Sequence, residues 1–406
     1  MSRITAIVTT FNRRDYLAQA IDALRSQTRP LEQIVIWDDG SSDGTGDYAA
    51  PLAAGSDGQI LYFRGENRGK SAALNAALHA STGDRIWICD DDDVVLPDAA
   101  ARLDAALDAT GAGLAVGAHT RFRVDPVTRI EEDLGTGYWP DLTQGSLLRH
   151  LLEDIFFFQN ATLVRRTALD SVGPFREDLA RSIDYDMFVR LATRFPMTFV
   201  HGILFRQRKH DGARGPAAAR HDAFQSEEVW RAADRAVFSG FRDILPLSLY
   251  EELFETSDPV LSRRVALLQR GCVYARRTDR VHAHADFAAA AGLAEPGDLR
   301  STERDILRRA LAGKHGPDAM FEPAALDDLS TLSRCGRLGR QIAAGLGRGA
   351  LWHGRAALER CDLPGALRAA RFVWRAGGPA ALFRPAPARG TPVKERRDLT
   401  AGAYAW

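Results

Sequence analysis

The chain of 406 residues has few cysteines and no long hydrophobic run. Its four cysteines, Cys89, Cys272, Cys335 and Cys361, lie far apart and form no CxxC pair, which argues against a disulfide framework and a zinc site. No stretch approaches the ~18 apolar residues of a membrane-spanning helix, and the N-terminal apolar run is too short for a signal peptide. We therefore expect a protein of a reducing, cytoplasmic compartment.

Two common nucleotide-binding motifs are also missing. The first apolar segment runs into Thr-Thr-Phe-Asn at positions 9–12 rather than GxGxxG, so the dinucleotide fingerprint is absent there. Residues 65–71, GENRGKS, have three residues between the glycines, whereas the phosphate-cradling P-loop has four. Neither a dinucleotide-binding domain nor a P-loop enzyme is predicted.

The net charge is zero, but the charge is unevenly distributed. Residues 331–406 carry fourteen Lys and Arg against four Asp and Glu, a balance of +10, which leaves about −10 for residues 1–330. This basic segment is expected either to be the solvated face of an Arg-rich helical domain or to contact an anionic membrane or a partner. The second alternative would place the protein at the inner face of a membrane. No nucleic acid partner is expected.

Strand and helix patterns alternate over the first hundred residues. Buried strands are predicted at 3–10, 32–37, 59–63 and 84–89, with helices between them near 17–24, 45–54 and 70–79. Asn12 stands where an N-cap of the first helix is expected. This alternation predicts a parallel α/β sheet with ligand groups at the carboxyl ends of its strands.

The pattern changes near residue 220. Ala, Arg and Leu then dominate, and helices of 12–18 residues are predicted one after another to about residue 375. We predict an α/β domain over 1–215, a helical domain over 216–384, and a flexible Pro- and Arg-rich tail over 385–406.

Four consecutive carboxylates, Asp90–Asp93, follow the apolar segment 86–89. In an extended chain alternate side chains share a face, so Asp90 and Asp92 should point one way and Asp91 and Asp93 the other. Such crowding raises the pKa of each carboxyl unless cations or hydrogen-bond donors offset it. Mg²⁺ or Mn²⁺ prefers oxygen ligands and leaves positions for substrate phosphates. The alternative is an ordinary helix start capped by Asp93 or Asp98.

Five segments occur in a recognisable order: TTFNR from residue 9, IVIWDDGSSDGT at 34–45, NRGKSAALNAAL at 67–78, DDDD at 90–93 and SIDYDMFVRLA at 182–192. Over roughly residues 1–215 the chain resembles family 2 glycosyltransferases of the GT-A fold. The resemblance implies a mostly parallel sheet flanked by helices, followed here by an α-helical C-terminal region.

The same resemblance implies a function. The chain would be an inverting hexosyltransferase that uses Mn²⁺ or Mg²⁺ and a nucleotide-sugar donor, expected to be a UDP-sugar. The acceptor would be a hydroxyl of a cell-surface polysaccharide, a lipopolysaccharide or a related glycan, free or lipid-linked.

The resemblance also implies roles for individual residues. Those of the donor site are Thr9, Thr10 and Phe11 at the uridine, Asp38 and Asp39 at the uracil, Arg68 and Lys70 at the diphosphate, and Asp91 beside the metal ligands Asp90 and Asp92. His210, in an Arg-x-His ending, would complete the metal shell or contact a phosphate.

The implied catalytic base is Asp184, which would take the proton of the acceptor hydroxyl. The preceding residue is Ile183, where family members usually carry Glu. Asp186 can instead be an N-terminal-turn carboxylate that interacts with the helix dipole. Tyr138 and Trp139 would form either an acceptor platform or part of a core.

Two other functions are compatible with such a domain. A sugar nucleotidyltransferase can share the fold and the carboxylate-bound metal, but it usually has a Gly-rich loop after the first strand, which TTFNRR lacks. A catalytically inactive binding or scaffold protein is the other alternative. The presence of Asp39, Asp90, Asp92 and Asp184 argues against it.

Overall fold

The computed structural model describes residues 2–209, 226–293, 297–314, 316–378 and 390–406. Its contacts divide the chain into two compact units. The α/β unit comprises Met1–Pro140 and Ile155–Ser226, and the helical unit comprises Asp141–Asp154 and Glu227–Trp406. The segment 141–154 thus belongs with the helices, whereas the sequence-based boundary at 215 assigned it to the first domain.

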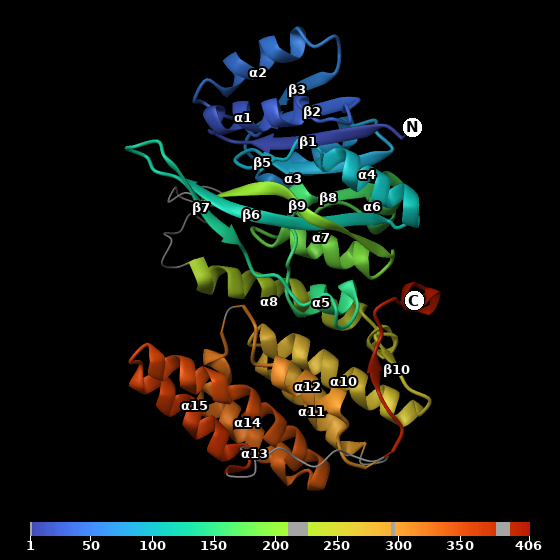
Figure 1. Ribbon diagram of the computed structural model, residues 1–406, viewed down its shortest axis with the longest axis vertical. Helices are drawn as coiled ribbons and strands as arrows, with labels where there is room; N and C mark the ends of the chain where they lie inside the picture. The colour runs from blue at the N-terminus through green and yellow to red at the C-terminus, as the bar shows by residue number, and fades with distance from the viewer. Residues whose placement is uncertain (1, 210–225, 294–296, 315, 379–389) are drawn as a thin grey trace. The chain divides into compact units, whose positions relative to one another are not determined.

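The α/β unit is built on one mixed sheet (Figure 1). Its first half contains β1 (Ile4–Thr10), α1 (Arg14–Arg25), β2 (Gln33–Asp38), α2 (Thr45–Ala54), β3 (Ile60–Arg64), α3 (Lys70–Ala80), β4 (Arg85–Asp90), β5 (Val94–Val95) and α4 (Ala99–Thr110). Its second half contains β6 (Leu114–Val124), β7 (Glu131–Thr136), the 3₁₀ turn η1 (Gln159–Ala161), β8 (Thr162–Arg165), α6 (Arg166–Val172), α7 (Ile183–Ala192) and β9 (Met197–Lys209).

The strand order is β3-β2-β1-β4-β8-β6-β9-β5, with β7 paired to β6. The first four strands are parallel, β8 runs antiparallel to β4 and β6, and β6 and β9 are parallel. The predicted fold, a mostly parallel sheet with flanking helices and a helical region after it, is confirmed.

The register of the central strands positions the polar residues that follow them. β1 is almost continuously buried, as is typical of a parallel strand covered on both faces, and its apolar residues end at Val8 before Thr9 and Thr10. Thr9 lies opposite Asp90 of β4, and Thr10 lies opposite Asp38 of β2. The carboxyl ends of three strands therefore bring these side chains to one edge of the sheet.

The start of α1 differs from the prediction. Its N-cap residue is Arg13, and Asn12 has a left-handed backbone with φ 53°. The Asn12 side chain accepts a hydrogen bond from the Ser42 backbone N–H at 2.7 Å, and its own N–H donates to Ser41 Oγ at 2.9 Å. The prediction of Asn12 as an N-cap is wrong, because this side chain joins the loops after β1 and β2 instead.

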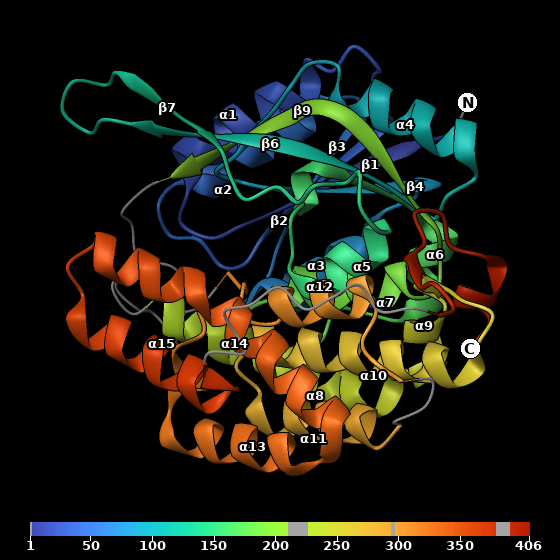
Figure 2. The ribbon, with the colours of Figure 1, turned by 60° about the horizontal axis from the view of Figure 1, so that its bottom comes forward.

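The helical unit is shown in Figure 2. Its elements are α5 (Leu147–Glu153), α8 (Ser226–Ile244), α9 (Leu247–Glu251), β10 (Phe254–Glu255), α10 (Pro259–Arg276), α11 (Arg280–Gly292), α12 (Ser301–Arg309), η4 (Asp318–Phe321), α13 (Pro323–Arg334), α14 (Gly336–Glu359), α15 (Leu363–Arg375), β11 (Lys394–Glu395) and η6 (Ala401–Tyr404). β11 pairs antiparallel with β10, so residues 394–395, predicted to lie in a flexible tail, belong to a small sheet. Among the described residues no helix is both long and apolar enough to span a bilayer.

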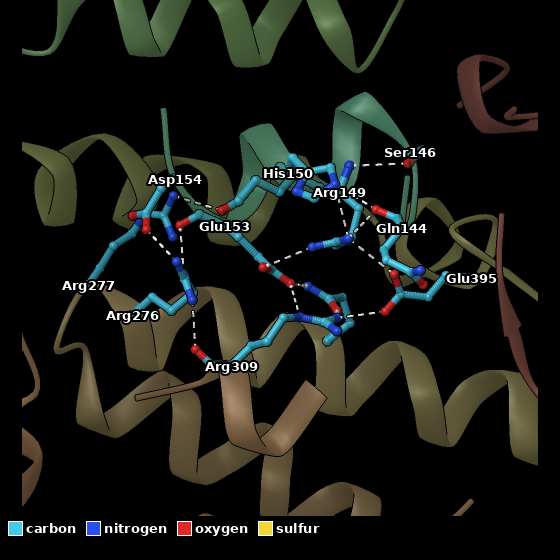
Figure 3. Close-up of polar contacts among 12 residues, drawn as sticks. Gln144, Ser146, Arg149, His150, Glu153, Asp154, Arg276, Arg277, Arg309 and Glu395 are labelled. Carbon is cyan, nitrogen blue, oxygen red and sulfur yellow. Dashed lines mark hydrogen bonds and ion pairs between the residues drawn. The ribbon is translucent and has the colours of Figure 1, made fainter. Parts of the chain in front are cut away.

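A buried ionic cluster joins distant parts of the helical unit (Figure 3). Glu153, at the end of α5, accepts hydrogen bonds from Arg149 at 3.1 Å and from Arg309 of α12 at 2.9 Å. Glu395 of β11 pairs with the same two arginines at 3.2 and 2.8 Å. The adjacent Asp154 pairs with Arg276 of α10. The cluster thus connects α5, α10, α12 and the C-terminal strand.

The arginines keep Glu153 ionised. Burial alone would raise the pKa of Glu153, but the charges of Arg309, Arg149 and Arg276 outweigh burial and hold that pKa well below its ordinary value. An unfolded chain would release the Glu153 proton only near pH ~4.3. The ionised group therefore stabilises the fold above that pH, and the contribution is lost as the pH falls.

We predict that Glu153→Gln lowers the unfolding free energy at pH 7 by ~3–5 kcal/mol, because it removes the buried negative charge that Arg149 and Arg309 share and leaves Glu395 as their remaining carboxylate. The deficit relative to wild type should shrink as the pH falls from 6 to 3. Denaturant unfolding followed by circular dichroism over this range measures both effects. Glu359→Gln is the matched control, since Glu359 forms an exposed pair with Arg355 and should change little. Equal effects of the two substitutions would contradict the role assigned to the cluster.

Candidate active site

The four carboxylates at the end of β4 divide into two pairs. The side chains of Asp90 and Asp92 are 28% and 17% exposed, whereas Asp91 and Asp93 are buried. The sequence-based expectation of alternating faces assumed an extended chain, but β4 ends at Asp90 and residues 91–92 form a turn, so the difference in exposure does not arise from strand alternation. We call Asp90 and Asp92 the outward pair and Asp91 and Asp93 the inward pair. The outward pair is the one available to a ligand.

The inward pair is held by the protein itself. Asp93 accepts a hydrogen bond from the Arg208 backbone N–H of β9 at 2.8 Å. Asp91 accepts from Arg13 at 3.0 Å, and the same guanidinium nitrogen donates to Asp92 at 2.7 Å. Burial raises the pKa of Asp91 to about 6, although the Arg13 charge opposes this shift. Burial, with the charges of Asp92 and Asp90, also raises the pKa of Asp93.

Lys70 faces the outward pair from the first residue of α3. Its Nζ forms an ion pair with Asp90 Oδ1. Desolvation would lower the pKa of the Lys70 ammonium, but the carboxylates of Asp90, Asp184 and Asp92 outweigh it and raise that pKa. These three carboxylates, which come from two distant parts of the sequence, therefore act on one ammonium group.

Asp184 lies in the first turn of α7, after Ser182, which has a left-handed backbone with φ 54°. Its side chain is half-buried and accepts a hydrogen bond from the Tyr185 N–H at 2.9 Å. The neighbouring Asp186 is buried and forms ion pairs with Arg190 at 2.8 Å and Arg176 at 3.6 Å. Asp186 thus has a structural role, and Asp184 is the carboxylate of this turn that lies near Lys70.

Asp38 and Asp39, predicted to face the uracil, make several contacts within the fold. Asp38 is fully buried and accepts hydrogen bonds from the Ser41 N–H at 2.7 Å and the Tyr62 hydroxyl at 2.8 Å. Asp39 accepts from the N–H groups of Arg68 at 3.0 Å and Gly69 at 2.9 Å. Burial raises the pKa of Asp39. These bonds fix the loop that leads into α3 and so position Lys70.

The remaining predicted residues differ in their surroundings. Thr10 is buried, and Thr9 and Phe11 are half-buried, at or just beyond the end of β1. The Arg68 side chain is exposed and pairs with Glu177 at 3.2 Å, so it does not join the Lys70 cluster in this structure. His210 lies outside the described residues.

Two residues of the site were not predicted from the sequence. Arg13 belongs to the motif TTFNR, but nothing in its spacing indicated that it bridges Asp91 and Asp92. Asn160 is fully buried, and its Oδ1 accepts a hydrogen bond from the Asp90 N–H at 3.1 Å. Its backbone oxygen accepts from the Trp87 indole at 2.9 Å. Asn160 is an isolated residue, and no sequence signal could have identified it.

The donor set at the outward pair suits a divalent ion that is shared with a substrate. No group of three or more His, Cys, Asp or Glu residues able to hold a metal occurs in the described part of the chain. Mg²⁺, however, is usually bound through one or two carboxylates together with substrate phosphates. Asp90 and Asp92 meet this requirement, with Lys70 and Arg13 beside them.

A separate hollow in the α/β unit has a volume of about 310 Å³. Its lining consists of Ala118, His119, Thr136, Gly137, Tyr138, Trp139, Phe199, His201 and Gly202. Trp139 packs edge-to-face on Phe156 with centroids 5.2 Å apart and tilted on Phe199 at 5.3 Å, whereas Tyr138 is exposed. Trp139 therefore belongs to an aromatic cluster and also to the wall of a pocket.

Known proteins with similar sequences and folds are glycosyltransferases or their relatives. Residues 5–173, within the α/β unit, match the family model described as Glycosyl transferase family 2. Among solved structures, TarS 1–349 of S. aureus in complex with UDP-GlcNAc superposes with a TM-score of 0.50 at 12% identity, covering 98% of this chain and 100% of that one. This likeness concerns the fold, which is of the GT-A type.

Two curated relatives are similar over shorter regions. Glycosyltransferase GlyA of Streptococcus pneumoniae is 31% identical over 137 residues, which cover 34% of this chain and 20% of the relative. Succinoglycan biosynthesis protein ExoO of Rhizobium meliloti is 35% identical over 114 residues, 28% of this chain and 32% of the relative. The alignments thus span a third or less of the length of these relatives.

We predict that Arg13→Met lowers the unfolding free energy by ~2–4 kcal/mol, because it leaves the buried Asp91 carboxylate without its cation. The adjacent Arg14→Met is the control, since the Arg14 side chain is exposed. Denaturant unfolding at pH 7 compares the two variants. Similar stability of both would show that Arg13 does not balance the carboxylates.

Proposed function

We propose that the α/β unit is an inverting glycosyltransferase that moves a sugar from a nucleotide-sugar, a UDP-sugar, to a hydroxyl of a glycan acceptor. The observation that carries the proposal is the ion pair of Lys70 with Asp90 at the carboxyl edge of the sheet, together with the charges of Asp184 and Asp92, which help to raise the pKa of the same ammonium group. Catalysis of sugar transfer needs this combination, since cationic groups must stabilise a leaving diphosphate while a carboxylate takes a proton.

The donor would bind with its diphosphate at the outward carboxylates. Asp92 and Asp90 would hold Mn²⁺ or Mg²⁺, with His210 as a further ligand, and the ion would neutralise charge on the leaving diphosphate. Lys70 supplies a fixed positive charge on the same side. Thr9, Thr10, Phe11 and Asp39 would surround the nucleoside, because they end the neighbouring strands or the loops after them. Asp38 and Asp91 would support this site from beneath.

Asp184 would act as the general base. In a single displacement the acceptor oxygen forms a bond to the anomeric carbon while the bond from that carbon to the phosphate oxygen breaks. The bonding electrons leave with the diphosphate, and the acceptor proton passes to the Asp184 carboxylate. Attack from the side opposite the leaving group inverts the configuration at the anomeric carbon.

The acceptor would be a cell-surface polysaccharide, a lipopolysaccharide or a related glycan, including a lipid-linked precursor. The similarity to ExoO, a succinoglycan biosynthesis protein, supports a polysaccharide acceptor. The hollow beside Trp139 and Tyr138 offers aromatic faces of the kind that pack on sugar rings. We extend the proposal to peripheral membrane contact through the basic C-terminal region, which would suit a lipid-linked acceptor.

Two alternative functions would give different results. A sugar nucleotidyltransferase would form a nucleotide-sugar from a nucleoside triphosphate and a sugar 1-phosphate, with release of pyrophosphate. An inactive scaffold would release no UDP from any UDP-sugar in the presence of an acceptor. Product analysis with Mn²⁺ therefore separates the three functions.

Asp184→Asn should leave UDP-sugar affinity near that of wild type while turnover falls by roughly two to four decades, as expected for loss of a general base. Calorimetry measures the affinity, and UDP release with acceptor measures turnover. Asp170→Asn, an exposed carboxylate on α6, should behave as wild type. Wild-type turnover of Asp184→Asn would place the base elsewhere.

Asp92→Asn should abolish the Mn²⁺-dependent rise in melting temperature that a UDP-sugar gives wild type, because mass action stabilises only a fold that binds the ligand. A thermal-shift series with Mn²⁺ or with EDTA measures this. Asp57→Asn is the control, since Asp57 is exposed and lies between α2 and β3, before the amino end of the strand rather than at the carboxyl edge of the sheet. If a UDP-sugar raised the melting temperature of Asp92→Asn as much as that of wild type, both with Mn²⁺ and with EDTA, the metal site would be refuted.

A further inference from the structure

The α14–α15 hairpin of the helical unit carries an unusual amount of exposed apolar surface. Of the fourteen large apolar side chains that are exposed in the described part of the chain, six lie between residues 351 and 374. They are Leu351, Trp352, Leu358, Leu363, Leu367 and Trp374. Figures 1 and 2 show α15 beside α14 at an edge of the helical unit.

Three of these side chains form a stripe along α15. Leu363, Leu367 and Trp374 are 65%, 66% and 72% exposed, and their spacing of four and seven residues places them on one side of the helix. The opposite side is buried through Ala369 and Phe372. The apolar stripe is therefore additional to the face that packs against the helical unit.

Arginines run next to this stripe. Arg368, Arg371 and Arg375 recur at intervals of three and four residues, so they form a second row between the apolar stripe and the buried face. From Gly336 to Arg375 the two helices and the turn between them contain eight Arg residues against Glu359 and Asp362 alone. The surface thus combines bulky apolar side chains with a strong positive charge.

We propose that the α15 stripe is a peripheral docking surface for an anionic phospholipid bilayer. Leu and Trp side chains would enter the acyl boundary, and the adjacent arginines would meet lipid phosphates. A second copy of this chain fits less well, because two faces with the same excess of arginine repel each other. The inference does not depend on the proposed sugar transfer, since the surface lies in the helical unit.

The experiment is co-sedimentation of the full chain with vesicles of phosphatidylcholine containing 30% phosphatidylglycerol, compared with pure phosphatidylcholine. Wild type should bind the anionic vesicles, and binding should weaken as salt rises. Leu363→Ser/Leu367→Ser/Trp374→Ser and, separately, Arg368→Glu/Arg371→Glu should each reduce the partition coefficient at least about tenfold. The substituted side chains are all exposed, so the melting temperatures should stay near that of wild type.

Matched controls keep the result specific. Arg129→Glu/Arg263→Glu makes the same change in net charge at two exposed arginines of other segments, and Val281→Ser removes an exposed apolar side chain of α11. Both should bind vesicles as wild type does. Failure of wild type to bind anionic vesicles, or equal loss in the controls, would overturn the proposal. The proposal would also be overturned if wild type formed a concentration-dependent dimer and bound no vesicles, and if the triple Ser variant abolished that dimer.

A thermal shift by UDP-sugar separates this proposal from the proposed activity. The α15 variants with reduced vesicle binding should show the same rise in melting temperature with UDP-sugar as wild type, because the altered residues lie outside the α/β unit. Vesicle binding without a donor response would leave the docking surface standing and count against the sugar transfer. A UDP-sugar shift without vesicle binding would leave the sugar transfer standing and overturn the docking surface.

Discussion

The balance between four adjacent carboxylates and two cations is the constraint on which the site depends. Asp90–Asp93 place four negative charges at the end of one strand, a costly arrangement without compensation. Arg13 contacts the buried Asp91 and the outward Asp92, and Lys70 contacts Asp90. Arg13 is the N-cap residue of α1 and Lys70 is the first residue of α3, so each cation stands at the start of a helix that follows a strand of the sheet. The fold of the parallel sheet and the charge of its edge are therefore linked.

Much of this edge could be predicted from the sequence, because it depends on local patterns. The apolar runs indicated the strands. Two-residue periodicity separated Asp90 and Asp92 from Asp91 and Asp93 but not which pair is exposed, and residues 91–92 form a turn rather than an extended segment. Parallel pairing then brings Thr9 and Thr10 beside Asp90 and Asp38. The proximity of Asp184 to this edge followed only from the family resemblance, since 92 residues separate it from Asp92.

The contacts that could not be predicted are long-range and made by residues with no pattern. Asn160 supports Asp90 through one buried hydrogen bond, and Asn12 leaves its expected capping role to bind Ser42. In the helical unit, periodicity predicted the helices after residue 220. It did not predict that α5 packs with them, because α5 is held there by the buried pairing of Glu153 with Arg309. The pairing of β11 with β10 could not be predicted from the sequence either, because strands of two residues have no periodicity.

The two units carry different kinds of charge arrangement. In the α/β unit, partly exposed carboxylates next to cations form a site suited to a metal and a diphosphate. In the helical unit, buried charges are paired with each other, and the arginines of α15 stay at the surface beside apolar side chains. The partly exposed carboxylates suit catalysis, the buried pairs suit stability, and the surface arginines suit contact with a charged surface.

The most direct test is a crystal structure of the wild-type chain with UDP and Mn²⁺. We expect Mn²⁺ bound to a carboxylate oxygen of Asp92 or Asp90 and to the diphosphate, with Lys70 Nζ turned toward a phosphate oxygen. UDP bound with its diphosphate away from Asp90 and Asp92, or Mn²⁺ held by other residues, would contradict it.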